Sequence, residues 1–587
     1  MEQREEQNAL PLRDAQIAGL TPALENWLMN KPLAAAPNDW LADTHQPENL
    51  SHELCDYNLY TEDAALTAAV VREGGQWGAE ALSVFGQACG TADYLALGRQ
   101  ANQYRPELDT HDRFGRRTDQ VNFHPAYHQL MDTAIRHGLH ASPWTEPGPG
   151  AHVVRAAHTY LHTQVEAGHG CPITMTFAAL PTLRLQPELA QLWEPGITAR
   201  HYDPRNIPMA QKQGLTIGMA MTEKQGGSDV RANSTRAYPL GRDGTGDAYE
   251  LVGHKYFVSA PMCDAFLVLA QAPGGLTCFL LPRWRPDGSK NPLQVLRLKN
   301  KMGNVANASS ETELRGALAW RVGEEGRGVP TIIEMVSLTR FDCMLGSSAG
   351  MRMAVSQALH HCAHRAAFGA KLNQQALMQN VLADLALESE AAMTLSLRMA
   401  RALDQRGQPH EDLLVRLVTA VGKYWICKRT PQHAYEAMEC IGGSGVMEDS
   451  MMPRLYREAP VNAIWEGSGN IQCLDVLRAL DKTPAVLTAL FDELGLARGA
   501  HALLDPFVAA LARDLRDPQQ REYRARGLVE RMALALQAAL LLQHAPDDVG
   551  DAFCRSRLAD TGGLNYGTLP TGVNVAALID RATPRLA

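Results

Sequence analysis

The sequence predicts an α+β protein of several domains, with helical segments on both sides of a compact β-domain. A chain of 587 residues is too long for one core, so three or four domains are expected. The hydrophobic pattern changes from helical to strand-like near Gly214 and returns to helical near residue 329. Alternating strands and helices with a glycine fingerprint are absent, so a bound cofactor is not expected on a parallel dinucleotide-binding sheet.

Five segments follow one another along the chain. Residues 1–43 are expected to form an extension with one helix around Asp14–Met29. Residues 44–214 are expected to be helical, because runs such as HVVRAAHTYLHTQVEAG repeat apolar residues every three or four positions. Residues 215–328 contain short apolar runs separated by turn residues, which predicts a β-domain. Helical periodicity returns over residues 329–482 and 483–587.

Composition excludes several classes of protein. The net charge of −9 gives no global positive field for nucleic acid or an anionic membrane, so a basic surface must be local. Eleven scattered cysteines without a C-x-x-C pair argue against a zinc module and a disulfide framework. The charged N-terminus MEQREEQNALPLRD lacks a secretory core, and no stretch approaches the roughly 18 apolar residues of a membrane span. We therefore expect a cytoplasmic protein without a bound metal.

Two motifs lie in the expected β-domain. In MTEKQGGSDV (221–230), glycines and a hydroxyl can approach phosphate or ring heteroatoms closely, with Glu223 and Asp229 bracing the loop. A glycine-rich hairpin turn explains the same residues. In GHKYFVS (253–259), Phe257 and Ser259 share one strand face and could stack on a flat ring and hydrogen-bond its edge, although core packing also explains them.

Two further motifs lie in the second helical region. Arg365, in RAAFG at a helix end, can bind phosphate or cap its own helix. The richest stretch runs from IGGSG (441–445) through PRLYRE (453–458) to IWEGSGNI (464–471). It contains Glu466 between Trp465 and Gly467. Taken alone, Glu466 could be an ordinary surface carboxylate.

The four motifs, in this order, resemble those of the acyl-CoA dehydrogenase family. MTEKQGGSDV is similar to the family's L-T-E-P-x-A-G-S-D loop, KYFVSA to K-x-W-I-T-N, RAAFG to R-x-x-F-G, and IWEGSGNIQ to I-Y-E-G-T-x-E-I-Q. The resemblance covers roughly residues 44–482. It implies a helical N-terminal domain, a β-barrel-like middle domain and a C-terminal four-helix bundle, followed here by an extra helical domain.

The resemblance also implies an FAD cofactor, usually in a homotetramer in which one subunit touches its neighbour's adenosine. Glu466 falls on the family's catalytic base, and Arg478 would lie near the mouth of the site. The positions that would contact FAD are Met221, Thr222, Gln225, Gly226, Gly227, Ser228, Phe257, Val258, Ser259, Arg365, Phe368, Gln379, Trp465, Gly467, Ser468 and Asn470. A carboxylate in an apolar, water-poor site has the raised proton affinity needed to take the α-proton of an acyl thioester.

The chain also departs from the common family pattern. Glu439 stands where many members have Gln, Gln375-Ala376 replaces Phe-Gln, and Val446 replaces Tyr. Longer stretches, including SLTRFDCMLGS and EAMECIGG, resemble a branch of the family that responds to DNA alkylation, over about residues 44–563. That resemblance implies feeble dehydrogenase activity, a C-terminal domain that binds double-stranded DNA without sequence preference, and protection of DNA from alkylating agents.

The C-terminal segment by itself leaves the DNA prediction open. Residues 483–587 contain 11 Arg, no Lys and 12 acidic residues. Its concentrated arginines suit phosphate contacts, and the predicted DNA-binding residues are Arg513, Arg516, Arg521, Arg524 and Arg526. A solvated helix with internal ion pairs explains them equally. Arg516, Arg524 and Arg531 share one face only if no break falls at Pro518.

Two functions are therefore in competition. The first is an FAD-containing, DNA-binding stress protein with weak activity on substrates such as isovaleryl-CoA. The second is a catabolic dehydrogenase for short or branched acyl-CoA thioesters with no DNA role. A flavin-free scaffold that retains only the fold is disfavoured by the intact loops.

Overall fold

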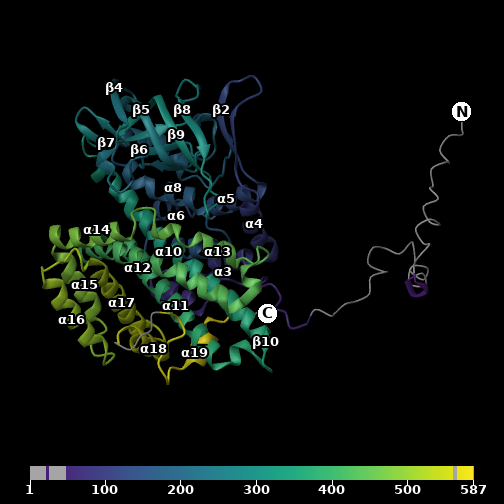
Figure 1. Ribbon diagram of the computed structural model, residues 1–587. Helices are drawn as coiled ribbons and strands as arrows, with labels where there is room; N and C mark the ends of the chain where they lie inside the picture. The colour runs from purple at the N-terminus through teal and green to yellow at the C-terminus, as the bar shows by residue number, and fades with distance from the viewer. Residues whose placement is uncertain (1–20, 25–47, 560–564, 586–587) are drawn as a thin grey trace. The chain divides into compact units, whose positions relative to one another are not determined.

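The computed structural model describes residues 21–24, 48–559 and 565–585. The chain divides into a short unit, residues 1–50, and a large unit, residues 51–587 (Figure 1). The helix expected around Asp14–Met29 falls mostly outside the described residues, and residues 22–24 within it are helical. Everything below concerns the large unit.

The N-terminal part of the large unit is helical, with one exception. Its helices are α2 (Ala64–Arg72), α3 (Ala79–Cys89), α4 (Ala92–Gln103), α5 (Pro125–Arg136), α6 (Ser142–Thr145), α7 (Ala151–Val165), α8 (Gly170–Leu183) and α9 (Pro187–Ile197). Thr91 caps α4 through its hydroxyl, and Pro125 occupies the first turn of α5, where its missing N–H costs nothing. The exception is the antiparallel hairpin of β1 (Glu107–His111) and β2 (Arg117–Asn122).

The hairpin corrects the uniformly helical pattern expected over residues 44–214. Its strands alternate exposed and partly buried polar residues, so they carry no apolar run that predicts a strand. The expectation for the next segment is confirmed. Its strands are β3 (Ile217–Ala220), β4 (Arg236–Asp243), β5 (Gly246–Ser259), β6 (Ala265–Ala272), β7 (Gly275–Pro282), β8 (Leu293–Leu298) and β9 (Ser309–Val322).

These strands close on themselves. Strand β6 pairs with β4 at one position and with β7 along its whole length, so the path β6–β4–β5–β9–β7 returns to its start (Figure 1). Strand β3 adds to β6 in parallel, and β8 adds to β9. The arrangement is the predicted barrel-like domain, and its closure leaves few strand edges unpaired.

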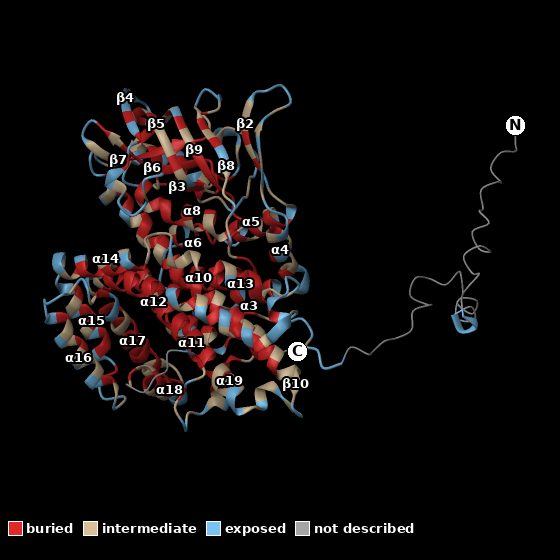
Figure 2. Ribbon diagram, viewed as in Figure 1, coloured by how far each residue is buried: buried red, intermediate tan, exposed pale blue. Residues whose placement is uncertain are grey.

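Long helices form the core of the C-terminal half (Figure 2). They are α10 (Gly328–His364), α11 (Ala376–Asp404) and α12 (Pro409–Ile441), followed by α13 (Met452–Glu458) and α14 (Gly469–Lys482), with α14 against α12. A two-residue hairpin, β10 (Ala366–Ala367) and β11 (Ala370–Lys371), joins α10 to α11. Helices α7 and α8 pack on α10, and Arg155 and Asp342 form a buried ion pair between α7 and α10 with Nη2 and Oδ2 2.6 Å apart.

The last five helices pack on this bundle. They are α15 (Ala485–Gly495), α16 (Leu504–Arg516), α17 (Ala525–His544), α18 (Asp547–Arg557) and α19 (Val575–Ala582). Buried ion pairs hold them: Arg398 of α11 bonds Glu411 of α12 and Glu493 of α15, and Arg557 of α18 bonds Glu388 of α11. In the described residues no helix is both long and apolar enough to cross a membrane.

Candidate active site

Glu466 lies in a tight turn directly before α14. Its φ angle is +57°, in the left-handed region that few non-glycine residues adopt, and Gly467 follows with a φ of +94°. Such a conformation costs roughly 1–3 kcal/mol and persists only where the surroundings impose it. The turn that carries the Glu466 carboxylate, directly before α14, is therefore held in this conformation by its neighbours.

Three helices hold this turn through its backbone carbonyls. Lys423 of α12 donates to the carbonyl oxygens of Trp465 (2.7 Å) and Gly467 (2.6 Å). Arg340 of α10 donates through Nε to the Glu466 carbonyl at 2.9 Å, and Gln472 of α14 donates to the same oxygen at 3.0 Å. Every one of these carbonyls would otherwise lack a helical partner.

The Glu466 carboxylate is only partly exposed and has a perturbed protonation equilibrium. Thr339 of α10 donates its hydroxyl to Oε2 at 2.9 Å. Burial raises the pKa of Glu466 above its ordinary value, while the Thr339 hydrogen bond and the charges of Arg340 and Lys423 act in the opposite direction. A raised proton affinity is the property that a proton-abstracting carboxylate requires.

Cys171 lies at the start of α8, and its thiol is influenced by groups of both the β-domain and the Glu466 turn. Burial raises the pKa of the Cys171 thiol to about 11, and the charge of Glu466 acts in the same direction. The charge of Lys301 and hydrogen bonding from Asn307 and Ser259 oppose it.

The loop at 221–230 is braced from within by Glu223. The Glu223 carboxylate accepts from Lys255 Nζ at 2.9 Å, and from the backbone N–H of Ser234 at 2.7 Å and of Thr235 at 3.2 Å. Burial opposes ionisation of Glu223, but Lys255 and the hydrogen-bond donors outweigh it and hold its pKa at about 2. The bracing role expected of Glu223 is confirmed. Asp229 starts a 3-10 turn without a side-chain cap.

The outer side of this loop is exposed, and its backbone passes close to Thr222 at Gly227. An added Cβ at Gly227 would lie 2.5 Å from Thr222 Oγ1, so only glycine lets the backbone approach that hydroxyl. Gln225, Gly227 and Ser228 are exposed, whereas Met221 and Thr222 are partly buried. Exposed N–H groups and hydroxyls around a glycine pair fit the pyrophosphate or ring edge of a flavin nucleotide.

Strand β5 has a β-bulge between Lys255 and Val258, so the shared face expected for Phe257 and Ser259 stays a prediction. Phe257 is 44% exposed, Ser259 is partly exposed, and Val258 between them is buried. The ammonium of Lys299 lies 4.2 Å from the centroid of the Phe257 ring. An exposed aromatic face beside a hydroxyl suits a flat, hydrogen-bonding ring, so these residues fit an isoalloxazine.

Several predicted residues lie at the other end of α10. Arg365 follows α10 directly, and Phe368 at the hairpin tip is fully exposed with a φ of +53°. Arg340 and Arg365 are 25 residues apart, or about 38 Å along the helix. The fold therefore does not bring Arg365, Phe368 and Gln379 to the Glu466 of their own chain.

Three other predicted residues near Glu466 in the sequence, Trp465, Ser468 and Arg478, have different partners. Trp465 donates its indole N–H to Asn462 at 2.9 Å, and Ser468 is the first-turn cap position of α14. Arg478 is 57% exposed at the side chain and lies 3.5 Å from Asp475, which also pairs with Arg340. Arg478 thus reaches the Glu466 turn only through Asp475 and Arg340.

The predicted DNA-binding arginines divide into two groups. Helix α16 ends at Arg516 and α17 begins at Ala525, so a break falls at Pro518 and the single arginine face is excluded. Arg521 pairs with Asp481, Arg524 donates to the carbonyls of Asp517 (2.8 Å) and Gln519 (3.0 Å), and Arg526 donates to Asn470 Oδ1 at 2.8 Å. Arg513 and Arg516 are exposed.

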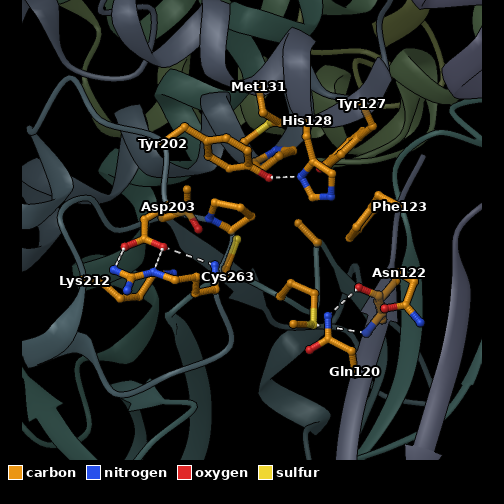
Figure 3. A pocket seen from close by; sticks show the side chains of 17 residues that line it. Gln120, Asn122, Phe123, Tyr127, His128, Met131, Tyr202, Asp203, Lys212 and Cys263 are labelled. Atoms are coloured by element: carbon orange, nitrogen blue, oxygen red, sulfur yellow. Dashed lines mark hydrogen bonds and ion pairs between the residues drawn. The ribbon is translucent and has the colours of Figure 1, made fainter. Parts of the chain in front are cut away.

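A cavity of about 300 Å³ is lined by residues of β2, α5, the first turn of α8 and the loop that follows β5 (Figure 3). Phe123, Tyr127, His128 and Tyr202 supply aromatic walls, and His128 Nδ1 lies 2.8 Å from the Tyr202 hydroxyl. Pro172, the neighbour of Cys171, forms part of its lining. Within the described residues, no group of three or more His, Cys, Asp or Glu side chains is arranged to hold a metal.

Sequence reasoning missed Thr339, Arg340, Lys423 and Cys171. Thr339 and Arg340 stand in the quoted stretch SLTRFDCMLGS, but their contact with Glu466 spans 127 and 126 residues of chain. No local spacing predicts such a contact. The β-domain loop and the Glu466 stretch were identifiable because each carries its residues consecutively.

Sequence profiles of three domains match the chain in order. The profile described as "Adaptive response protein AidB N-terminal domain" matches residues 49–204. Those described as "Acyl-CoA dehydrogenase, middle domain" and "Acyl-CoA dehydrogenase, C-terminal domain" match residues 218–317 and 326–480.

Known proteins are similar along nearly the whole chain. The "Putative acyl-CoA dehydrogenase AidB" of Escherichia coli K12 is 47% identical over 523 residues, covering 89% of this chain and 96% of that protein. "Acyl-CoA dehydrogenase family member 11" of Caenorhabditis elegans is 32% identical and covers 70% of this chain and 67% of its own length.

Solved structures show the same fold. Caenorhabditis elegans ACDH-11 in complex with C11-CoA has a TM-score of 0.80 at 27% identity, over 89% of this chain and 95% of that one. A Bacillus anthracis acyl-CoA dehydrogenase complexed with FAD has a TM-score of 0.59 at 18% identity, over 73% and 80%. The chain belongs to the acyl-CoA dehydrogenase family of FAD-dependent oxidoreductases, with the domain composition of AidB.

Proposed function

We propose that this protein is an AidB-type flavoprotein that combines weak acyl-CoA dehydrogenase activity with binding of double-stranded DNA and protection of DNA against alkylation. The dehydrogenase part rests on one observation: the strained turn that presents the Glu466 carboxylate, with its raised pKa and its hydrogen bond from Thr339. The proposed substrates are short or branched acyl-CoA thioesters such as isovaleryl-CoA.

Glu466 acts as the base of the reaction. Its carboxylate takes the proton from the carbon next to the thioester, and the electrons of that C–H bond enter the new carbon–carbon double bond. FAD, when bound, supplies the acceptor for the hydride that leaves the β-carbon. Lys423, Arg340 and Gln472 hold the Glu466 turn, so the base is positioned before substrate arrives.

Thr222, Gly227 and Ser228 would bind the flavin nucleotide, and Phe257 and Ser259 would lie against its ring. Arg365 and Phe368 would serve a neighbouring subunit, because the length of α10 separates them from their own Glu466. Phe368 and Leu377, 101% and 87% exposed, are apolar side chains whose burial would stabilise that contact. We therefore propose a homotetramer.

The first test replaces Glu466 by Gln, with Glu107→Gln on the exposed strand β1 as the control. The Glu466→Gln protein should bind FAD and remain yellow, because the amide keeps the shape of the side chain. It should lose flavin bleaching by isovaleryl-CoA or butyryl-CoA under anaerobic conditions by at least about 100-fold, a typical contribution of a general base. Stopped-flow absorbance measures both properties.

A colourless Glu466→Gln protein would show that Glu466 is needed for the structure and that the assignment as base is wrong. Absence of bleaching in the unchanged protein, with thioesters of every chain length, would remove the dehydrogenase activity and leave the DNA role alone.

DNA binding is supported by the C-terminal helices. The last dehydrogenase profile ends at residue 480. The alignment with Escherichia coli AidB spans 523 residues of this chain, so it must extend beyond residue 480 into the C-terminal segment. Arg513 and Arg516 lie one turn apart and exposed on α16. In an assembly of four subunits, such a weak patch would be repeated and its affinity multiplied.

The DNA test compares Arg513→Ala/Arg516→Ala with a control, Arg136→Ala, whose side chain is 70% exposed on α5. Each phosphate contact contributes about 0.9 to the slope of log affinity against log salt, so the double variant should lower the slope by about 2 per contacting subunit. Fluorescence anisotropy of a labelled duplex at several salt concentrations measures it. No retention of duplex at about 50 mM salt would refute this role.

A second function is favoured by a different observation. Three of the five predicted arginines are already engaged within the chain, which is the behaviour of a solvated helical surface without a nucleic-acid partner. A catabolic short- or branched-chain acyl-CoA dehydrogenase without a DNA role would show rapid bleaching together with no duplex binding. The two assays above therefore separate the candidates.

We also propose that the protein works in the cytoplasm. All eleven cysteines are free thiols, nine of them buried, and buried free thiols are typical of a reducing compartment.

A further inference from the structure

Lys301 is an inward-facing lysine directly behind the end of strand β5. It lies in the loop between β8 and β9 and is only partly exposed. Its ammonium donates to the backbone carbonyl of Asn307 at 2.8 Å and to the hydroxyl of Ser309 at 3.1 Å. Burial lowers the pKa of Lys301 to about 8.

Ser309 connects this ammonium to Ser259. The two residues pair across β5 and β9, and their hydroxyl oxygens are 3.0 Å apart. An ammonium can only donate, so Ser309 accepts from Lys301 and keeps its own proton to donate to Ser259. Ser259 can then donate its own proton onward. The charge of Lys301 thus fixes the direction of a short hydrogen-bond chain.

The charge of Lys301 is not cancelled by an ion pair. The titratable groups that act on it are Cys171 at the start of α8, Glu166 after α7, and Glu458 at the end of α13. Glu166 already accepts from His169 and from the backbone of Gly168, at 2.8 Å each.

The other two groups are neutral near pH 7. Burial raises the pKa of Glu458 to about 8 and that of Cys171 to about 11. Within the described residues, no carboxylate oxygen lies within ion-pair distance of Lys301. Glu166, whose pKa is lowered to about 2, is the ionised carboxylate among these groups, and the Lys301 ammonium itself donates to Ser309.

We infer that Lys301 is a positioning residue for the flavin, and that its charge, relayed by Ser309 and Ser259, stabilises the reduced cofactor and raises its reduction potential. This inference rests on the proposed function, in which the isoalloxazine lies against Ser259. Reduced flavin carries more negative charge than oxidised flavin, so a nearby positive charge favours it, and the effect is largest where water is excluded.

The test measures the midpoint potential of the FAD-loaded protein by anaerobic titration with reference dyes. Lys301→Met should shift the ratio of oxidised to reduced flavin about tenfold at pH 6.5, which is about 30 mV lower for a two-electron couple. Lys301→Arg keeps the charge and should stay near the unchanged protein. Lys482→Met, at the exposed end of α14, is the matched control and should have no effect.

The pH dependence distinguishes charge from shape. At pH 9.5 the lysine of the unchanged protein is itself neutral, so its potential and that of Lys301→Met should converge. A purely structural role for Lys301 would give the same difference at both pH values. If Lys301→Met does not fold, Lys301→Gln replaces it, because the amide retains donors for Asn307 and Ser309 without the charge.

Two serine variants separate this inference from the proposed function. Ser309→Ala should lower the potential while leaving the absorption spectrum of bound FAD nearly unchanged. Ser259→Ala should alter both. If Ser259→Ala alters neither, the ring does not lie against Ser259 and the proposed placement is wrong. If Ser259→Ala alters both and Lys301→Met shifts the potential at neither pH, only the role of Lys301 is overturned.

Discussion

Glu466 shows how much a single residue's chemistry depends on distant parts of the chain. Its identity as a carboxylate between Trp465 and Gly467 was visible in the sequence. Its strained φ, its raised pKa and the Thr339 hydrogen bond come from α10 and α12. A turn that is costly by itself is stabilised because three helices satisfy its carbonyls.

The Thr339 hydroxyl should set the pH at which Glu466 becomes a base. A hydrogen bond to a charged group is worth roughly 1.5–3 kcal/mol, so Thr339→Val should raise the pKa of Glu466 by about one pH unit or more. The rate of flavin reduction by an acyl-CoA rises as Glu466 ionises, so its midpoint should move to higher pH. Stopped-flow reduction between pH 5 and 9 measures the shift.

Thr331→Val provides the control on the same helix, because the Thr331 hydroxyl donates to the carbonyl of Arg327, the residue that precedes the helix, at 2.9 Å. Its profile should keep the midpoint of the unchanged protein. An unmoved midpoint in Thr339→Val would mean that the hydroxyl bonds neutral and ionised Glu466 equally.

Site residues could be predicted where they stand together in a short motif, and could not where their contacts lie far apart in the sequence. Glu223, Gly227, Ser228, Phe257 and Ser259 were identifiable because each lies in a short run with its own spacing. Lys301 and Cys171 were not, because their importance arises from contacts with Ser309, Ser259 and Glu466 that local spacing does not encode.

Among the described elements, α10 is the longest at 37 residues and serves two separate places. About a third of the way along, Thr339 and Arg340 hold the Glu466 turn, and the β10–β11 hairpin follows its end. Helix periodicity predicted α10 and the change of texture predicted the β-domain. The β1–β2 hairpin was missed because its faces are polar, and the break at Pro518 was left open because proline also tolerates helix first turns.

The hairpin between α10 and α11 should control assembly. Phe368 is fully exposed with a left-handed φ, and asparagine tolerates that conformation better than an aromatic residue. Phe368→Asn should leave the unfolding free energy of a subunit unchanged or slightly higher, while weakening the proposed tetramer and its FAD retention by about tenfold. Sedimentation velocity and the flavin-to-protein absorbance ratio measure these effects.

Tyr523→Asn is the control, since Tyr523 is 89% exposed in a different part of the chain. An assembly unaffected by Phe368→Asn but disrupted by Tyr523→Asn would place the interface on the C-terminal helices.

The whole molecule is tied together by buried polar groups as well as by its apolar core. Arg398, Glu411 and Glu493 join α11, α12 and α15, and Arg155 with Asp342 joins the N-terminal and C-terminal helical parts. Breaking such a pair typically costs about 3–5 kcal/mol, because it leaves a buried charge alone. The C-terminal helices are thus an integral part of the bundle.

Buried histidines should make the folded state sensitive to mild acid. Burial lowers the pKa of His140, His158 and His433 to about 4, from 6.5. Each therefore contributes stability that is present above pH 6.5 and is lost as pH falls toward 4, by roughly 3 kcal/mol per histidine. The thermal midpoint should fall steeply in that window.

His158→Phe tests this explanation, because the ring cannot titrate and His158 already packs on Phe85, 5.0 Å away between centroids. The variant should lose less stability than the unchanged protein between pH 7 and pH 5 in calorimetry. His201→Phe, at an exposed position, should behave as the unchanged protein does. Equal acid sensitivity of all three proteins would assign the effect to other groups.

The hydrogen bond from Arg526 to Asn470 joins the two proposed functions through one contact. Asn470 is four residues from Glu466, at the start of α14, and Arg526 starts α17. A ligand that binds Arg526 must first break the hydrogen bond between Arg526 and Asn470. The free energy needed to break that hydrogen bond therefore weakens the binding of the ligand. Thermodynamic linkage makes the coupling mutual: if duplex binding loosens the flavin by some factor, removing the flavin must tighten the duplex by the same factor.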